Sequence, residues 1–212
     1  MIKAKRISLP LGQAVVNQLK SGDRVLISGE LFTARDAVHQ RFHKLLAMGC
    51  KLPVDLRGQT LFYAGPAPAP RGKMIGSIGP TTSGRMDAYT PLLLARAGLK
   101  AMIGKGRRSQ EVIEAIKKNK AVYFAATGGA AALLAQTVVR AETVLFAELG
   151  PEAVLKLTVK DLPAVVAVDC RGRDVYEEGP KKFRPLPFPS PLRRGNVKVK
   201  KVKRWKNHLK SY

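Results

Sequence analysis

Short hydrophobic runs alternate with amphipathic segments through most of this chain. The runs are rich in β-branched and aromatic residues and are bounded by turn formers, which is typical of buried strands. They lie at 24–28, 61–65, 100–104, 121–126 and 164–168, with weaker strand patterns at 3–9, 142–145 and 153–159. Helical spacing of apolar residues marks 15–19, 33–47, 89–97, 109–119 and 130–138, and a last short element begins at Tyr176. Because strands and helices alternate, the pattern predicts an α/β fold with a mixed sheet flanked by helices.

The helix predicted over 33–47 has an unusual first turn. Thr33 is expected to cap it, after a strand that ends near Ser28, and Asp36 has the charge that a helix N-terminus favours. Arg35 lies in the same turn, where a cation works against the helix dipole, and this local mismatch indicates a functional role. A surface arginine paired with Asp36 or Glu30 is the alternative.

A polar loop separates the strand at 61–65 from the helix at 89–97. Its central residues are Gly79, Pro80, Thr81, Thr82, Ser83, Gly84 and Arg85. The Gly-Pro pair punctuates the backbone, and the three hydroxyl residues offer hydroxyls and amides in series. Arg85 supplies a planar fork that suits a carboxylate. The loop is therefore either an anion site for a small carboxylic acid or a polar loop with a Ser/Thr helix cap.

Two glycine turns follow predicted strands. Gly104-Lys105-Gly106 lets the backbone approach a ligand and leaves the ammonium group in open space, but it lacks the spacing of a nucleotide-binding P-loop. Gly128-Gly129 lies between a strand and a helix, which is a favourable place for an anion. A basic turn and close packing of small residues are the respective alternatives.

The polar corners at Arg35, at 81–85 and at Lys105 all fall where a strand ends or a helix starts. Ligands of open α/β sheets bind at the carboxyl ends of strands, so we expect these groups to meet there. Two guanidinium groups, a pair of hydroxyls and an ammonium group together suit a dicarboxylate.

The sequence offers few groups for metal or acid–base chemistry. His39 and His43 have the spacing of a helical metal site, but without a third ligand we interpret them as packed or exposed helix residues. Cys50 and Cys170 form neither a disulfide framework nor a metal knuckle, which favours a reducing, cytoplasmic location. No membrane span and no signal peptide are expected.

Length and charge divide the chain in two. We expect one domain at 1–180 and a basic tail at 181–212, because twelve of the 38 Lys and Arg residues and no acid follow Glu178. The tail could bind nucleic acid, or it could be a solvated or partner-docking extension. The remaining excess of positive charge suits an anionic substrate or an acidic partner.

These motifs carry a family resemblance over about residues 3–178. The segments 28–36 (SGELFTARD), 79–87 (GPTTSGRMD) and 104–106 (GKG) resemble the class I, iron–sulfur fumarate hydratases, with support from 63–68, 128–131 and 148–168. The similarity is to that family's C-terminal domain, or to its β subunit where the enzyme is split. Ser83 stands where the family often has alanine, and the tail from Pro180 onward is not part of the pattern.

The resemblance implies a swivelling β/β/α domain and the reversible hydration of fumarate to L-malate, a hydro-lyase reaction of the tricarboxylic acid cycle. In this family a 4Fe-4S cluster is held by three cysteines of the α portion, and its open iron acts as a Lewis acid for the departing hydroxyl. No such cysteine trio is present in this chain. An α subunit is therefore the expected partner, in a heterodimer or an α2β2 heterotetramer, and no metal ligand is expected here.

The resemblance also implies roles for individual residues. Arg35 and Arg85 would clamp the substrate carboxylates, Lys105 would add a third cationic contact, and Thr82 would hydrogen-bond. Thr81 has the position of the base that removes the C3 proton. Because a free threonine hydroxyl is a very poor base, that role requires activation by a neighbour, for which we expect a carboxylate of the partner.

Three rival functions stay open from the sequence. An L(+)-tartrate dehydratase β subunit needs the same cationic clamps for another four-carbon dicarboxylate. A nucleic-acid-binding protein would act through the basic tail, and a purely structural subunit would use none of the site residues.

Overall fold

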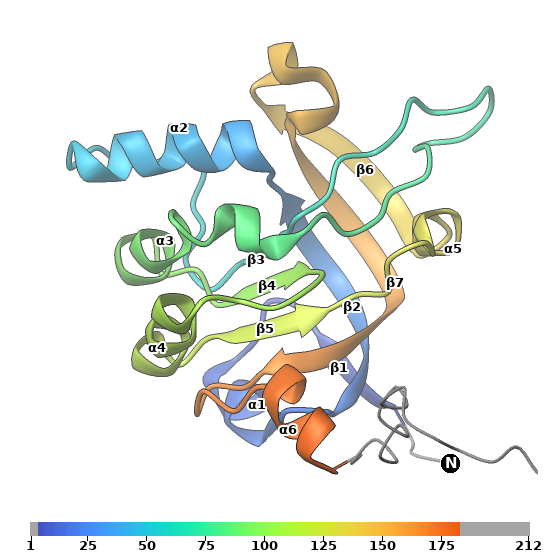
Figure 1. Cartoon of the computed structure of the whole chain (residues 1–212). Coiled ribbons are helices and arrows are strands. Elements are labelled where there is room, and N and C mark those ends of the chain that lie inside the picture. Colours follow the sequence, from blue (N-terminus) through green and yellow to red (C-terminus); the bar gives the residue numbers. More distant parts are fainter. Residues whose placement is uncertain (1–3, 183–212) are drawn as a thin grey trace, which may run out of the picture.

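Seven strands form one mixed sheet in the order β1-β2-β3-β4-β5-β7-β6 (Figure 1). The computed structural model describes residues 4–182, so most of the predicted basic tail, and the alternative of nucleic-acid binding through it, lie outside the described residues. The strands are β1 (Lys5–Ser8), β2 (Arg24–Thr33), β3 (Thr60–Phe62), β4 (Ala101–Gly104), β5 (Val122–Ala125), β6 (Val138–Leu145) and β7 (Val154–Val168). β1 to β5 pair in parallel, and β7 runs antiparallel to its partners. The predicted α/β class with a mixed sheet is confirmed.

The sheet closes on itself through the long strand β7. One side of β7 pairs with β2 between Lys156 and Val165, and its other side pairs with β6 and then with β5. The strands β2, β3, β4, β5 and β7 therefore form a closed ring, with β1 and β6 outside it. Each strand of the ring has two hydrogen-bonded neighbours within it, and β2 and β7 each pair with one further strand outside it. The finer assignment to a swivelling β/β/α domain, and the domain boundary at 180, stay predictions.

Helices pack against both faces of the strands that form the ring. They are α1 (Gln13–Gln18), α2 (Asp36–Ala47), α3 (Thr90–Arg96), α4 (Gln110–Asn119), α5 (Ala131–Ala135) and α6 (Val175–Lys182), with 3-10 turns η1 (Ser83–Met86) and η2 (Ala147–Glu152). Figure 1 shows α2, α3 and α4 stacked along one side of the sheet. Leu61 and Tyr63 pack in a core with these helices, whereas Phe62 between them packs in a second core with α1 and α5. This alternation is the period of a strand that is buried on both faces.

The entry to α2 differs from the prediction. β2 does not end near Ser28 but continues to Thr33, because β7 pairs with it as far as Phe32. Thr33 is consequently not the helix cap: its buried hydroxyl donates to the Ala153 carbonyl at 3.3 Å and accepts from the Leu155 amide at 2.9 Å. The cap residue is Arg35, in extended conformation and without a capping side-chain bond.

Two other predicted boundaries are wrong. The strands expected at 153–159 and 164–168 are one strand, β7, which passes through Asp161 in a left-handed conformation (φ 55°). The helix expected over 130–138 ends at Ala135, because the chain is drawn into the sheet as β6 from Val138. The cap of α4 is confirmed, with the Val112 amide donating to the Ser109 hydroxyl at 3.4 Å. No helix within residues 4–182 is long and apolar enough to cross a membrane.

Candidate active site

The predicted site residues gather at the carboxyl ends of three adjacent parallel strands. Arg35 follows β2, the loop with Thr81 and Arg85 lies beyond the end of β3, and Lys105 follows β4 directly. Because β2, β3 and β4 are neighbours in the ring, their ends meet at one rim. The expectation that these corners come together is confirmed for the backbone segments that carry them.

The Thr81 loop is hydrogen-bonded between β3 and β4. The Thr81 amide donates to the Tyr63 carbonyl at 2.7 Å, and the Thr81 carbonyl accepts from the Lys105 amide at 3.1 Å. The Ser83 amide then donates to the Lys105 carbonyl at 2.9 Å. Two segments about twenty residues apart in sequence are thereby fixed side by side, which holds Thr81, Thr82 and Lys105 at the same place on the rim.

Asp36 joins the two arginines. Its Oδ1 lies 2.8 Å from Nε of Arg85, and its Oδ2 lies 3.9 Å from Nε of Arg35. The Arg85 side chain is 51% exposed, so most of its fork faces solvent. Two guanidinium groups from different segments therefore form ion pairs with one carboxylate at the start of α2, where the helix dipole also favours negative charge.

Arg35 is held more tightly than Arg85. Its Nη2 lies 3.4 Å from Glu152 of η2, and its side chain passes so close to Gly65 that a Cβ there would lie 3.1 Å from Cδ of Arg35. Nε of Arg35 and Oδ2 of Asp36 are buried, and neither has a hydrogen-bond partner among the described residues. Buried polar atoms are nearly always paired, so an unpaired donor and acceptor 3.9 Å apart mark a place for a further polar group.

Lys105 extends over the second glycine turn. A Cβ on Gly128 would lie 3.4 Å from Cδ and 3.9 Å from Nζ of Lys105, so the turn leaves room for this side chain. Lys105 itself is exposed. Gly129 has positive φ and precedes α5, which has only five residues. The structure thus brings Gly128 to Lys105, and anion binding by the turn itself stays a prediction.

The two threonines present free hydroxyl groups. Thr81 is partly exposed and Thr82 is exposed, and within residues 4–182 neither side chain takes part in a hydrogen bond. The described chain therefore offers no group that would activate Thr81 as a base.

A buried ion pair lies beneath the exposed site. The Arg108 guanidinium is 0% exposed and donates to Asp87 at 2.7 Å and to the Thr90 hydroxyl at 2.8 Å. It lies between the rings of Tyr63 and Tyr123, 5.3 and 5.0 Å from their centroids. Asp87 ends the Thr81–Arg85 loop and also accepts from the Ser109 amide at 2.6 Å. One ion pair therefore ties that loop to the segment that follows Lys105.

Ser83 anchors the loop from inside. Its hydroxyl lies 2.9 Å from that of Tyr123, which donates to the Gly106 carbonyl at 2.9 Å. Because a carbonyl oxygen can only accept, the Tyr123 hydroxyl donates its proton to the Gly106 carbonyl. The Ser83 hydroxyl therefore donates to the Tyr123 oxygen. Burial raises the pKa of the Tyr123 hydroxyl, which keeps that proton in place. A Cβ on Gly104 would lie 1.9 Å from the Ser83 hydroxyl, so glycine is needed here because of close packing.

His39 supports Arg35 from below. The His39 ring is buried and packs edge-on against Tyr63, with centroids 5.0 Å apart. Its Nδ1 lies 2.8 Å from the carbonyl of Arg35, so Nδ1 carries the proton. Burial lowers the pKa of His39 to about 4, and the ring is neutral at pH 7. The interpretation of His39 as a packed helix residue agrees with this position.

The chain's own groups do not fit an iron–sulfur cluster. Cys50 is exposed at the end of α2, whereas Cys170 is buried, with its sulfur 3.9 Å from Asn17. Among residues 4–182 there is no group of three or more His, Cys, Asp or Glu placed to hold a metal. We therefore derive no chemical step through a cluster on this chain.

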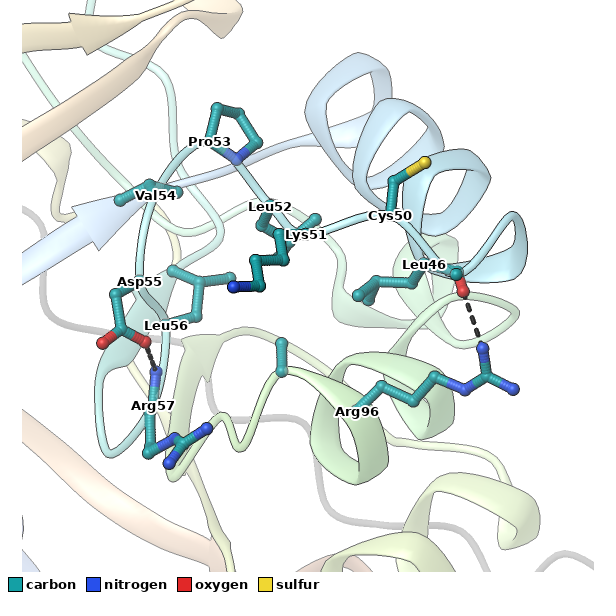
Figure 2. A pocket seen from close by; sticks show the side chains of 12 residues that line it. Leu46, Cys50, Lys51, Leu52, Pro53, Val54, Asp55, Leu56, Arg57 and Arg96 are labelled. Atoms are coloured by element: carbon teal, nitrogen blue, oxygen red, sulfur yellow. Dashed lines mark hydrogen bonds between the residues drawn. The ribbon is translucent and has the colours of Figure 1, made fainter.

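One hollow of the described surface lies away from the site. A pocket of about 610 Å³ opens between the C-terminal ends of α2 and α3 and the loop 49–57 (Figure 2). There Arg96 donates to the Leu46 carbonyl at 2.8 Å, and Lys51 and Arg57 are exposed. Arg35 caps the start of α2 and Arg85 precedes α3, so the site residues form a wall at the opposite ends of these helices.

Sequence reasoning missed several residues that build this wall. Glu152 is far from Arg35 in sequence, and no local pattern links the two. Asp87 was visible at the end of the loop, but its partner Arg108 has the sequence context of a basic turn. Asp36 was noted as a helix-start residue and as a partner of Arg35, and the structure adds its bond to Arg85. Glu30 pairs instead with Lys156.

Comparison with known proteins now assigns this architecture. The sequence model of the family described as fumarase C-terminus matches residues 2–179. The chain belongs to this family. The matched range includes all of the residues that form the rim of the fumarase C-terminus domain described above, and it leaves the basic tail outside.

Relatives of the family differ in how much of them this chain covers. Fumarate hydratase 2 of Leishmania major is 41% identical over 164 residues, which are 77% of this chain and 29% of that protein. The anaerobic class I fumarate hydratase of Escherichia coli K12 is 39% identical over 166 residues, which are 78% and 30%. A protein assigned as L(+)-tartrate dehydratase subunit beta in Methanocaldococcus jannaschii is 40% identical over 172 residues, which are 79% and 88%. The chain thus spans less than a third of the first two and most of the third.

Proposed function

We propose that this chain is the β subunit of a class I fumarate hydratase and forms one wall of an active site that a separate α subunit completes. The reaction is the reversible addition of water across fumarate to give L-malate. The observation that carries the proposal is the convergence of Arg35 and Arg85 on one carboxylate, that of Asp36, with a donor of Arg35 left unpaired. A carboxylate already bound between two guanidinium groups supports a clamp for the carboxylates of a substrate.

The proposed roles follow from what each group can do. The exposed fork of Arg85 binds one substrate carboxylate, and the part of the Arg35 side chain that reaches the surface, 25% of it, contacts the same carboxylate. Lys105, on the other side of Thr81, meets the second carboxylate. Thr82 donates a hydrogen bond from its free hydroxyl. Such contacts fix the dianion in one orientation, which is the main contribution a positioning wall makes to rate.

Thr81 is the proposed base for the proton at C3. In the dehydration direction its oxygen takes that proton while the hydroxyl group leaves C2. In hydration the proton returns to C3 from the same oxygen. Because an alcohol is a very poor base, and because the described chain offers Thr81 no partner, we assign its activation to a carboxylate of the α subunit.

The 4Fe-4S cluster belongs to the α subunit in this proposal. One finding supports a two-chain enzyme: the chain is 40% identical to a protein named as a β subunit and covers 88% of it. The heterodimeric or α2β2 arrangement and the cytoplasmic location are part of the same proposal.

Dehydration of L(+)-tartrate is the second candidate reaction. It is favoured by the 40% identity to the Methanocaldococcus subunit, of which this chain covers 88%. Tartrate is also a four-carbon dicarboxylate, so the same clamp would hold it, and its extra hydroxyl would face Thr82 or Lys105.

One experiment tests the proposal and separates the two reactions. The full chain is co-expressed without oxygen with a candidate α subunit that has the three cluster-binding cysteines, and the complex is assayed with fumarate, L-malate and L(+)-tartrate. We expect interconversion of fumarate and L-malate, with a higher kcat/KM than for tartrate. Activity on tartrate alone would favour the second reaction. A complex with an intact cluster and no activity on any of the three would overturn the proposal.

A further inference from the structure

An apolar face without acidic residues lies beside the site, and nothing in the described chain covers it. It consists of the loop 66–77, α5 and residues 136–141, and we call it the acid-free face. The loop leaves the rim after Gly65 and returns to it at Gly79, shortly before Thr81. The acid-free face therefore adjoins the site. Figure 1 shows this loop projecting beyond the sheet on the side of α5 and β6.

Large apolar side chains are exposed on this face. Met74 is 59% exposed, Leu133 64% and Val139 55%. Together with Val144 farther along β6, they are four of the six large hydrophobic residues that are exposed within residues 4–182. Clusters of this kind on a soluble protein mark interaction sites.

The face is also hollowed. A groove of about 580 Å³ runs between the loop and α5, lined on one side by Pro68, Met74 and Ile75 and on the other by Ala132 and Ala135. Backbone hydrogen bonds fix the segments around the groove: the Ile78 amide donates to the Ala131 carbonyl at 3.2 Å, and the Ala67 amide to the Ser77 carbonyl at 2.9 Å. The two arms of the loop are thus fixed to each other and to α5, as a preformed docking surface requires.

Charge around the groove indicates what kind of partner fits. No Asp or Glu occurs at 66–77 or at 131–141, and Arg71 and Lys73 are exposed around the apolar residues. Arg140 is exposed too, but it pairs with Glu142 at the border of the face. A second copy of this chain is disfavoured, because a two-fold interface would bring the same basic patch against itself. The tail is disfavoured for the same reason, since residues 183–212 contain ten basic residues and no acid.

We infer that the acid-free face is the docking surface for the α subunit, which would insert an apolar segment with an acidic rim into the groove. This inference rests on the proposed function, because it needs an α subunit to exist. A chain seated on the face would be in contact with the loop that leads to Thr81, close to both Arg35 and Lys105. It would thereby reach the place from which the activating carboxylate has to come.

Matched aspartate substitutions test the inference. Met74→Asp and Leu133→Asp add a charge at exposed positions on the face, and Met48→Asp adds the same charge at a methionine that is 67% exposed at the far end of α2. The affinity of each full-length variant for the co-expressed α-type protein is measured by pull-down and titration. We expect Met74→Asp and Leu133→Asp to weaken binding about tenfold or more and Met48→Asp to leave it unchanged. Affinity of the unmodified chain should also fall as salt is added.

Hydrogen exchange gives a second readout that needs no variant. In the complex, amides of 66–77 and 131–141 should be protected more strongly than those of 48–57. Binding by the unmodified chain with no effect of either aspartate, or protection elsewhere, would overturn the docking surface but not the enzyme. If the unmodified chain does not bind the α-type protein at all, the proposed function fails together with the surface. Self-association that Leu133→Asp abolishes would identify a second copy as the occupant and overturn the inference.

Discussion

Two arginine–aspartate pairs hold the C-terminal end of the same loop, and they have nearly the same length. Nε of Arg85 lies 2.8 Å from Asp36, and Nε of Arg108 lies 2.7 Å from Asp87. Their surroundings differ completely. The Arg85 side chain is half exposed, whereas that of Arg108 is fully buried between two tyrosine rings with a further bond to a threonine hydroxyl.

The two ion pairs therefore differ in role: the buried pair fixes the loop, and the exposed pair can bind a ligand. Every direction around the Arg108 guanidinium is taken by protein, so this pair has no capacity for a ligand and fixes the loop. Arg85 uses one nitrogen on Asp36 and keeps the rest of its fork for another carboxylate. An exposed ion pair contributes little to stability, and a buried one is costly to break on one side. The fold thus combines a rigid, buried ion pair at Arg108 with an exposed ion pair at Arg85 whose arginine can take another partner.

The buried pair should give the largest effect on stability. Arg108→Met leaves Asp87 buried without its cation, and we expect the free energy of unfolding to fall by about 3–5 kcal/mol. The measurement is urea denaturation of the full chain. Arg107→Met is the matched control, because Arg107 is exposed, and it should change stability by less than about 1 kcal/mol. Equal losses in the two variants would contradict the contrast between the pairs.

The open pair should give the largest effect on activity instead. Arg85→Met in the reconstituted complex should lower kcat/KM for fumarate by about 100-fold, because a charge-assisted contact to the substrate is lost. Its unfolding midpoint should hardly move. Arg57→Met, an exposed arginine of the distant pocket, serves as the control and should leave both quantities unchanged. Unaltered activity of Arg85→Met would favour a purely structural subunit.

Acid should lower the free energy of unfolding through protonation of the buried His39. Its pKa is about 4 in the folded chain and 6.5 when unperturbed, so the unfolded state binds the proton more readily. Stability from this residue is complete above pH 6.5 and is lost as pH falls from 6.5 towards 4, by about 2 kcal/mol between pH 7.5 and pH 5. Denaturation curves at both pH values measure it. His39→Gln should flatten this dependence, and His43→Gln, one turn along the helix, should not.

The packing beneath the loop gives the smallest expected effect. Gly104→Ala places a methyl group where the Ser83 hydroxyl lies, and we expect a loss of about 1–2 kcal/mol in stability. Adding Ser83→Ala removes the atom that the methyl group meets and should recover part of that loss. Thermal unfolding of the single and double variants decides this. A double variant no better than Gly104→Ala would mean that the Tyr63 ring, and not Ser83, restricts the space.

Local patterns in the sequence predicted most of the fold. Helix α4 and the buried strands followed from periodicity and turn residues, because their environment is uniform along their length. Closure of the ring could not be predicted, since it depends on β7 pairing with β2 and β5 over long separations. The same pairing extends β2 to Thr33 and moves the helix cap to Arg35, a tertiary effect that overrides the local preference.

The site was predictable where its residues are adjacent in sequence. The turns at 79–85 and 104–106 have compositions that only an exposed polar site explains well, so Arg85 and Lys105 could be selected. Groups that act across the fold gave no such signal: Glu152 reaches Arg35 from η2, and Arg108 reaches Asp87 from beyond the next strand. Distance in sequence, and not chemical type, separated the residues that were found from those that were missed.

Strand β6 has a consequence for the supply of this chain in a cell. It is the outer strand of the sheet, bonded only to β7 within the described chain, and it exposes Val139 and Val144 beside its free backbone groups. An open edge of this kind is a template for strands of other molecules, and Arg140 and Glu142 are its charged protection against aggregation. If the proposed α subunit covers this side of the chain, copies made in excess of it would carry that edge uncovered. Synthesis of the two chains in equal amounts would therefore leave few unpaired copies, and so limit their aggregation and their degradation by proteases.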